Sequence, residues 1–325
     1  MRAIVASCCL FLGTIMSHSQ EVDYSIVSVP EESGVDFRKI TSNNDFVCMP
    51  EVRRTMKGLS WYTNRILDVS ADGNKIAYLS IRGETSNVFV KDLSRLGTSV
   101  QRTNRKAVLD FSYSHDGKLM VFSEKSLKSN MIFQTDAANG FICRQITNGS
   151  YDYSPIYSKE CDKIFFTRAE ATSTSIWIYN LAENYLSSYT IGMNPCVTND
   201  SSTLLCVRVN GYGRGEIWKV DYQTGVEECI ISDIQRSFST PSLSPDGQWV
   251  LMVCSTPVPC GKTVYWNTDI AVCKVDGSSF MQLTYHVADD VSPVWSKDGK
   301  YIYFISQRGD ADASANVWRM SFNAL

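Results

Sequence analysis

The side chains best suited to catalysis or ligand binding are three acids and a histidine near the starts of two similar segments. Asp289 and Asp290 follow closely after His286, and Asp152 occupies the place of Asp290 in an upstream copy of the segment. Grouped carboxylates can bind a cation, and a pair at fixed separation can hydrolyse a glycosidic bond. We therefore predict that these four residues face a ligand. The alternative for each is a turn or loop residue that bonds only to nearby backbone.

Other chemistries lack the residues they need. The chain has three histidines, and only His115 and His286 lie beyond residue 19. His115 lies inside a turn, where a solvated side chain is expected. The glycine-rich stretch 210–215 has no helix after it, so it does not form a phosphate-binding loop, but its Tyr212 and Arg214 could contact a partner. We predict no catalytic set, metal or cofactor.

The acids belong to a phrase that recurs about six times. Its clearest copy is residues 290–304, with the core Ser296-Lys-Asp298-Gly299, and related cores contain Asp72, Asp116 and Asp246. Asp-Gly before an apolar run is a strong hairpin signal, since glycine accepts positive φ without strain. The turn acids recur every 40 to 52 residues. This spacing, with several strands per unit, is typical of a propeller blade.

Two further strands complete each unit. An aromatic-bearing segment such as 176–180 supplies the third, and the phrase at 281–284 supplies the fourth. The last unit ends at Leu325 without a fourth strand, and residues 36–42 contain a matching phrase. We predict an all-β fold: a six-bladed β-propeller of four-stranded antiparallel blades, closed by this N-terminal strand in the last blade. Residues 20–62 would form an N-terminal extension and 63–325 the propeller.

The repeat at 290–300 resembles the TolB-type propeller repeat, also described as WD-like. The resemblance covers roughly residues 36–325 and implies a TolB-like six-bladed propeller. It is weak for function, because such blades occur in transport accessories, in prolyl-oligopeptidase-type peptidases and in polysaccharide lyases. Residues 20–62 are too few for the α/β domain that precedes the propeller in TolB, so TolB's partner does not carry over directly. Two histidines also cannot supply the metal-binding set of the oligogalacturonate lyases.

The N-terminus predicts export. Arg2 precedes an uncharged apolar stretch, and Ser17-His-Ser19 suits signal peptidase, so residues 1–19 would be a signal peptide cut before Gln20. No other segment is long enough to span a bilayer. The net charge of −3 argues against a nucleic-acid partner. Of the nine cysteines beyond residue 9, Cys254 and Cys260 flank a short loop-like stretch and are the candidate disulfide, with buried free thiols as the alternative.

We therefore expect an exported, monomeric, non-catalytic binding propeller in the periplasm or at the cell surface, engaging an envelope protein or glycan. The alternative function is a carbohydrate-active enzyme, a glycoside hydrolase or lyase, with carboxylates in the channel. A deep pocket containing Asp152 and Asp290 would favour the enzyme, and a narrow, filled channel would count against it.

Overall fold

The computed structural model describes nine ranges of the chain: residues 23–50, 52–54, 60–62, 65–95, 97–140, 142–198, 202–221, 223–260 and 263–323. The predicted signal peptide, residues 1–19, and its cleavage site lie outside the described residues. Within these ranges the chain is built from β-strands, with two short 3₁₀ turns at Pro30–Glu32 and Asn43–Asp45. No helix among the described residues has the length and apolarity needed to cross a membrane.

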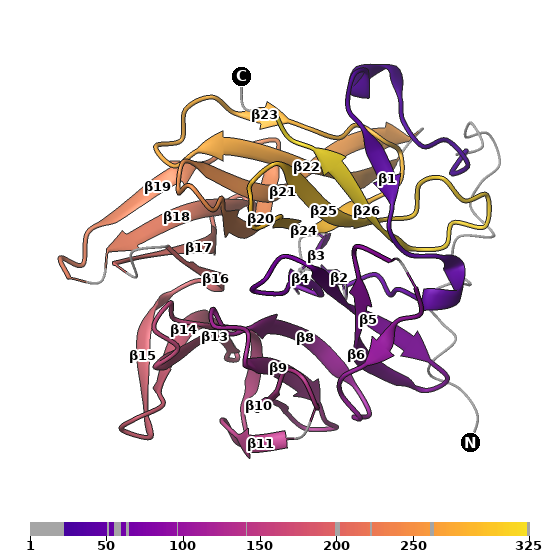
Figure 1. The fold of residues 1–325 in the computed structure, drawn as a ribbon. Helices are drawn as coiled ribbons and strands as arrows, with labels where there is room; N and C mark the ends of the chain where they lie inside the picture. The colour runs from indigo at the N-terminus through magenta and orange to yellow at the C-terminus, as the bar shows by residue number, and fades with distance from the viewer. Residues whose placement is uncertain are drawn as a thin grey trace.

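The strands form six groups of four around a central axis, each antiparallel within itself and running from the innermost strand outward (Figure 1). A single parallel pairing of Asn130 with Tyr151 joins the second and third groups into one eight-stranded sheet. Blade one contains β4 (Leu67–Val69), β5 (Lys75–Arg82), β6 (Thr85–Asp92) and β7 (Val100–Gln101). Blade two contains β8 (Val108–Tyr113), β9 (Leu119–Lys125), β10 (Asn130–Asp136) and β11 (Ile142–Gln145). Blade three contains β12 (Tyr151–Tyr157), β13 (Lys163–Ala169), β14 (Thr174–Asn180) and β15 (Tyr185–Ile191).

The second half of the ring repeats this order. Blade four contains β16 (Met193–Val197), β17 (Thr203–Val209), β18 (Gly215–Asp221) and β19 (Glu227–Ile231). Blade five contains β20 (Ser237–Leu243), β21 (Trp249–Cys260), β22 (Thr263–Lys274) and β23 (Met281–Gln282). Blade six contains β24 (Asp290–Trp295), β25 (Tyr301–Ser306), β26 (Asn316–Ser321) and the N-terminal strand β1 (Phe37–Lys39).

The N-terminal strand joins the two ends of the chain. β1 pairs antiparallel with β26, with Phe37 opposite Met320 and Lys39 opposite Trp318. The innermost strands also contact one another in sequence around the axis, and β24 contacts β4. Because β1 covers the outer edge of β26, the outer edge of blade six is reduced to the three residues of β1, which offers little to pair with another chain.

Each blade turns from its first to its second strand through the repeated phrase. In blade two the Ser114 hydroxyl donates to Asp116 Oδ1 over 2.7 Å and accepts from the Leu119 N–H over 2.9 Å. Gly117 has a φ of +72°, in the left-handed region that glycine tolerates. The same serine–aspartate bond recurs at Asp72, Asp246 and Asp298. The Asp-Gly unit is therefore a structural turn, which we call the Ser-x-Asp-Gly turn.

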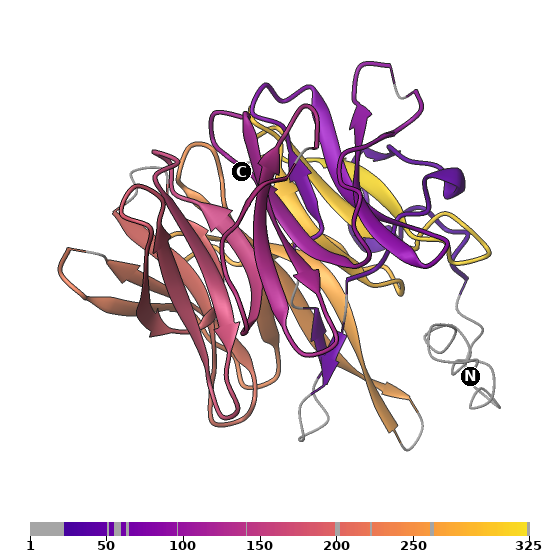
Figure 2. The same cartoon turned by 90° about the horizontal axis from the view of Figure 1, so that it is seen from below.

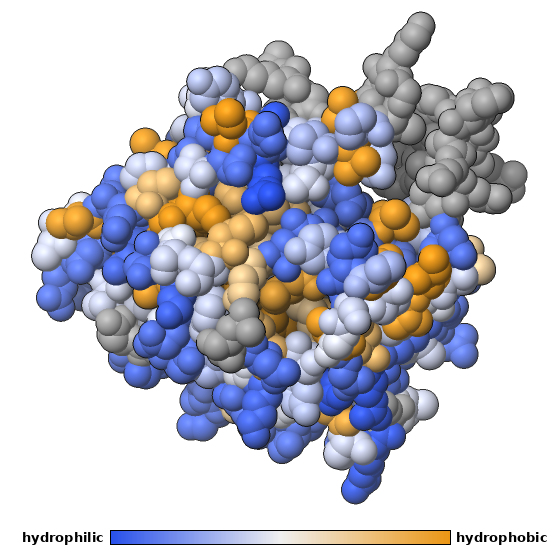
Figure 3. All heavy atoms as spheres, turned by 90° about the horizontal axis from the view of Figure 1, so that it is seen from above, coloured by the Kyte–Doolittle hydropathy of each residue, from blue (hydrophilic) through white to orange (hydrophobic). Residues whose placement is uncertain are grey.

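The hydrophobic core lies between neighbouring blades. One cluster packs Leu251 and Ile270 of blade five against Phe304 and Trp318 of blade six, and all four are buried. Alternate residues of each strand thus bury against the next sheet, as expected for sheets stacked face to face. The surface seen from above in Figure 3 is mostly hydrophilic, and its apolar side chains gather mainly in a hollow near the centre.

The two ends of the ring carry different connections between strands. The Ser-x-Asp-Gly turns lie at one end, which we call the turn end. The connections between second and third strands, and those between blades, lie at the opposite hairpin end. Figure 2 shows the orange β21–β22 hairpin projecting well beyond the ring, on the same side as the indigo hairpin of β2 (Val52–Arg54) and β3 (Ser60–Tyr62).

The β21–β22 hairpin corrects the disulfide prediction. Cys254 and Cys260 do not flank a loop, because both belong to the continuous strand β21. Six residues of extended strand separate their Cα atoms by about 20 Å, whereas a disulfide needs less than about 7 Å. Cys254 is instead a fully buried free thiol, and burial raises its pKa to about 12. It packs as a small apolar side chain.

Candidate functional site

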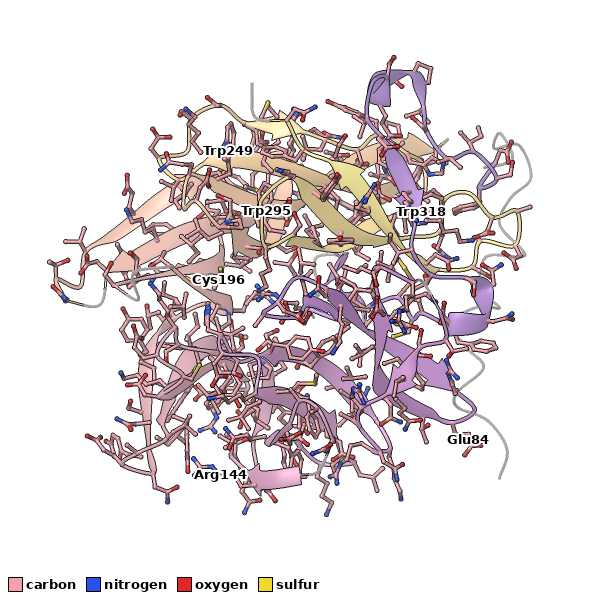
Figure 4. All side chains as sticks on the ribbon, viewed as in Figure 1. Glu84, Arg144, Cys196, Trp249, Trp295 and Trp318 are labelled. Atoms are coloured by element: carbon pink, nitrogen blue, oxygen red, sulfur yellow. The ribbon has the colours of Figure 1, made fainter. Side chains whose placement is uncertain are left out.

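A pocket of about 280 Å³ opens at the turn end of the central channel. All six blades contribute to it, and every contribution comes from an innermost strand or the residues beside it. Its walls include Tyr157 from blade three, Cys196 from blade four and Trp295 from blade six. Figure 4 shows Cys196 and Trp295 on inner strands near the centre of the ring. We call this space the turn-end pocket.

Arg65 forms the floor of this pocket. It borders the turn-end pocket on one side and, on the other, a small space of about 10 Å³ lined also by Thr240, Asn194 and Pro155. Its Nη2 donates to the carbonyl oxygen of Pro241 over 3.0 Å, from blade one to blade five. The space beyond Arg65 has room for about one water molecule. Arg65 therefore closes the channel with a cationic side chain.

The rim of the pocket comes from the variable residue x of the Ser-x-Asp-Gly turns. This residue lies over the turn glycine of the next blade, as three pairs show. A Cβ built on Gly73 would lie 3.5 Å from the Lys297 Cβ, one on Gly117 would lie 2.9 Å from the Ala71 Cβ, and one on Gly299 would lie 3.8 Å from the Pro245 Cδ. The repeated turn thus holds residue x at the channel mouth. The residues at x that line the pocket are His115, Pro245 and Lys297.

The residues of the pocket that can carry charge near neutral pH are Arg65, Asp68, His115 and Lys297. Both Asp68 oxygens already accept backbone N–H groups, from Val69 over 2.8 Å and from Tyr113 over 2.9 Å. Partial burial and the nearby positive charge of Lys297 lower the pKa of His115, so its ring is neutral at pH 7. Two cations therefore face one carboxylate whose oxygens are already engaged.

The sequence-predicted acid Asp152 lies elsewhere. Its carboxylate is fully buried and makes two bonds to Arg168, from Nε over 2.7 Å and from Nη2 over 3.0 Å. The Arg168 guanidinium also stacks 4.3 Å above the Trp177 ring. The prediction that Asp152 faces a ligand is corrected here, because its charge is paired inside blade three and has no solvent access.

Asp290 is paired in the same way at the junction of blades five and six. It bonds to Nη2 of Arg308, whose two Nη atoms also each contact Glu32 over 3.1 Å. Asp290, Arg308 and Glu32 are all buried. This cluster fastens the N-terminal segment to the ring, because Glu32 also accepts the Tyr285 N–H over 2.9 Å. A charge so enclosed stabilises structure and is not available to a ligand.

His286 and Asp289, which precede Asp290 in the sequence and were predicted with it to face a ligand, do not line the turn-end pocket. His286 is fully buried, its Nδ1 accepts the Ala288 N–H over 2.9 Å, and burial lowers its pKa. Asp289 accepts the Thr268 N–H over 3.0 Å. The neighbouring Asp269 was not predicted: burial, and then the negative charge of Asp290, raise its pKa to about 9.

Tyr212 and Arg214 lie at the hairpin end, between β17 and β18. Tyr212 is 70% exposed. The Arg214 guanidinium lies 4.4 Å from the Trp266 ring centroid, and its Nε donates to the Ile234 carbonyl oxygen over 3.3 Å. The glycine-rich loop, the β19–β20 connection and the long hairpin thus meet at one place. We call these residues, together with the exposed Val264, which lies on the same face of β22 as Trp266, the hairpin-end patch.

Sequence reasoning missed the turn-end pocket. Arg65 carries no local motif, and its convergence with Trp295, an aromatic residue of the repeated phrase, depends on the closed ring. One signal was present: residue x changes from Ala71 to His115, Lys159, Pro245 and Lys297 while its serine and acidic neighbours recur. Variation at one position of a recurring turn indicates that the turn itself does not require a particular side chain there.

The comparisons with known proteins agree with this architecture. The family model described as the TolB beta propeller domain matches residues 66–258. The chain belongs to this family. The match covers blades one to four and part of blade five, and the repeat analysed above is the pattern that carries it.

Solved structures extend the likeness over most of the chain. A protein assigned as TolB from Agrobacterium tumefaciens matches with a TM-score of 0.59 and 14% identity, over 82% of this chain and 93% of that one. TolB from Acinetobacter baumannii matches with a TM-score of 0.59 and 16% identity, over 77% and 64%. An oligogalacturonate lyase from Vibrio parahaemolyticus matches with a TM-score of 0.58 and 12% identity, over 90% and 94%. At these identities the likeness establishes the propeller fold alone.

Proposed function

We propose that this protein is an exported binding propeller of the cell envelope and that it engages a protein partner through the hairpin-end patch. The observation that carries the proposal is the composition and exposure of that patch. Tyr212 is 70% exposed, Ile234 is 69% exposed and Val264 is 59% exposed, and each belongs to one of the three segments that meet at the contact of Arg214 with Trp266. Tyrosine, tryptophan and arginine are the residues enriched at the energetic centres of protein interfaces.

The shape of the patch favours a protein over a glycan. β21 and β22 pair along their full length, from Trp249 with Lys274 to Cys260 with Thr263, so the hairpin projects as one ribbon. Exposed aliphatic side chains beside it, Ile234 and Val264, add apolar area that sugar hydroxyls do not match. Clustered apolar side chains on a projecting element are typical of an interaction site. The TolB structures among the similar proteins support an envelope role by analogy.

The enzyme alternative rests on channel carboxylates. Asp152 and Asp290 are each bonded to a buried or nearly buried arginine, Arg168 and Arg308. The carboxylate that does line the turn-end pocket, Asp68, accepts two backbone N–H groups. Turnover of a pectic or other acidic glycan by the purified protein would favour the enzyme and count against a purely binding role.

A matched pair of tyrosines tests the proposal. A photo-crosslinking phenylalanine derivative would replace Tyr212 in one variant and Tyr185 in another. Tyr185 is 61% exposed but begins β15, at the turn end of blade three. Cross-linking in envelope-bearing cells should give a discrete protein adduct from position 212 and none from position 185. Equal labelling at both positions, or none at 212, would contradict the proposed surface.

A further inference from the structure

We propose that the turn-end pocket binds a small organic ligand through its carboxylate, with Arg65 at the floor and Lys297 at the rim. The pocket is distinct from the hairpin-end patch, because the first lies at the Ser-x-Asp-Gly turns and the second at the opposite end of the same strands. The inference therefore stands apart from the proposed protein partner. Four properties of the pocket carry it: charge, directionality, wall chemistry and size.

The charge of the pocket favours a monoanion. Arg65 and Lys297 supply two positive charges, and Asp68 supplies one negative charge. The two Asp68 oxygens accept the Val69 and Tyr113 N–H groups, so backbone donors already stabilise this negative charge. One carboxylate brings the pocket to neutrality. A phosphate dianion would instead leave an excess negative charge beside Asp68, which low-dielectric walls make costly.

Arg65 is positioned to recognise a carboxylate. One of its N–H groups is directed to the Pro241 carbonyl oxygen on the far side of the channel, which fixes the guanidinium across the axis. A guanidinium has five N–H donors in a rigid plane, a shape that matches two carboxylate oxygens. Because the side chain is already held in place, little additional rotamer entropy is lost on binding.

The walls suit the organic part of the ligand. Tyr157 and Trp295 are almost fully buried behind the pocket surface, and Tyr113 is partly exposed beside them. The Trp295 indole N–H is already used, donating to the Ser242 carbonyl oxygen over 3.2 Å. These aromatic residues therefore border the pocket with apolar surface, while the cations provide the polar contact. Such walls also focus the field of the cations toward the mouth.

The size of the pocket limits the ligand. At about 280 Å³ it lies at the small end of ligand pockets, which are roughly 300–1,000 Å³. It can hold one group of the size of an amino acid. That group can be a free small acid, or the C-terminal residue of a peptide whose remaining chain stays outside the mouth. Both sources present the same carboxylate.

The pocket contains its own reporter. His115 lies at the rim, whereas His286 is buried elsewhere, so the NMR ring signals of these two histidines form a probe and an internal control. The purified protein would be titrated with three probes: the monocarboxylate butyrate, the tripeptide Gly-Ala-Tyr with a free C-terminus, and the same tripeptide as its C-terminal amide. We expect a saturable shift of His115 with the tripeptide acid, butyrate or both, little with the amide, and no shift of His286.

Two lysines at the same turn position provide the matched variants. Lys297 lines the pocket, whereas Lys159 occupies position x in blade three and is exposed outside it. Lys297→Met should weaken binding of the active acid about tenfold, since a charged donor is lost. Lys159→Met should change it less than twofold, although both variants alter the net charge equally. Unchanged amide dispersion in both spectra would show that the variants remain folded.

The outcomes separate cleanly. Binding of the tripeptide acid alone identifies a chain end as the ligand, and binding of butyrate alone identifies a free acid; both support the proposal. Equal affinity for acid and amide would overturn it, because the carboxylate would then be irrelevant. Equal losses from Lys297→Met and Lys159→Met would also overturn it, because only long-range charge would be acting. The absence of a saturable shift with every probe up to about 10 mM would also overturn the proposal.

Discussion

The Arg65 guanidinium donates to the carbonyl oxygen of Pro241 across 3.0 Å, joining blade one to blade five through the centre of the ring. The two residues are far apart in sequence, and blade six lies between their blades along one arc of the circle. This bond makes the channel a closed pocket at the turn end, with a separate small space beyond it. Arg65 is thus both a structural cross-link and the floor of the inferred ligand site.

Replacing Arg65 with Met should lower the stability of the fold modestly. The variant keeps much of the apolar stem but loses a hydrogen bond from a charged donor, and the Pro241 carbonyl can be rehydrated through the pocket. We expect the free energy of unfolding to fall by about 1–2 kcal/mol. Urea denaturation measures it, with the exposed Arg95→Met as the control, for which we expect a change within about 0.5 kcal/mol. Equal losses in the two variants would show that the bond to Pro241 contributes nothing.

Removing Asp152 should have a much larger effect. Asp152→Ala leaves Arg168, only 12% exposed, without its bidentate partner, and breaking such a pair costs about 3 kcal/mol. The combined change Asp152→Leu with Arg168→Met should recover most of this loss, because two apolar side chains replace the pair. Urea midpoints of both variants measure the effect.

The exposed pair of Lys163 with Asp162 provides the control for Asp152. Both side chains keep at least 40% of their surface exposed, so Lys163→Met should cost less than about 1 kcal/mol. If Asp152→Ala proved as mild as Lys163→Met, the buried pair would not stabilise blade three, and Asp152 would again be a candidate for ligand binding.

Gly117 should resist substitution because of its contact with the neighbouring blade. Its φ is +72°, and a Cβ at this position would lie 2.9 Å from the Ala71 Cβ of blade one. Gly34 has a similar φ of +86° but no atom within 4 Å of the built Cβ. Backbone strain should therefore lower the free energy of unfolding of both alanine variants by about 1 kcal/mol. The steric contact should lower that of Gly117→Ala by a further amount of about 1–3 kcal/mol. Thermal or urea unfolding gives the difference; equal costs would mean that the blades move apart freely at their turns.

The fold followed from short-range signals that repeat. Asp-Gly between a serine and an apolar run specifies a hairpin at Asp116 and Asp298 alike, and its period specifies the ring. The closing strand was predictable because residues 36–42 supply the strand that the last unit lacks, and β1 indeed pairs with β26. Each of these inferences uses residues close together in the chain or a regular spacing between them.

The candidate sites depended on contacts that carry no such signal. Asp290 was recognised as unusual, but its partners Arg308 and Glu32 come from a later strand end and from the N-terminal segment. Nothing in the spacing shows that the three meet in the interior. Arg65 likewise reaches the Pro241 carbonyl oxygen only because the closed ring brings blades one and five close together. The disulfide prediction was wrong because Ser255 to Pro259, which looked like a loop, extends a strand.

The buried Asp269 should make stability depend on pH in an identifiable direction. Its pKa is about 9 in the folded protein, because burial and the Asp290 charge oppose ionisation, and about 4 in an unfolded chain. Between these values the folded state holds a proton that the unfolded state releases. The contribution of Asp269 to the free energy of unfolding is fully present below about pH 4. It is lost as pH rises toward 9, with a slope of at most about 1.4 kcal/mol per pH unit.

Asp269→Asn tests this directly, because the amide resembles the protonated acid and cannot titrate. The stability of the variant relative to the parent should increase steadily from pH 5 through 6.5 to 8, as measured by urea denaturation at each pH. Asp72→Asn is the control: hydrogen bonds from Ser70 and the Asn74 N–H lower the pKa of that exposed turn acid, so its difference from the parent should stay constant over the same range. A constant difference for Asp269→Asn as well would mean that Asp269 is ionised in the fold, and that the blade five–six junction holds a second buried negative charge.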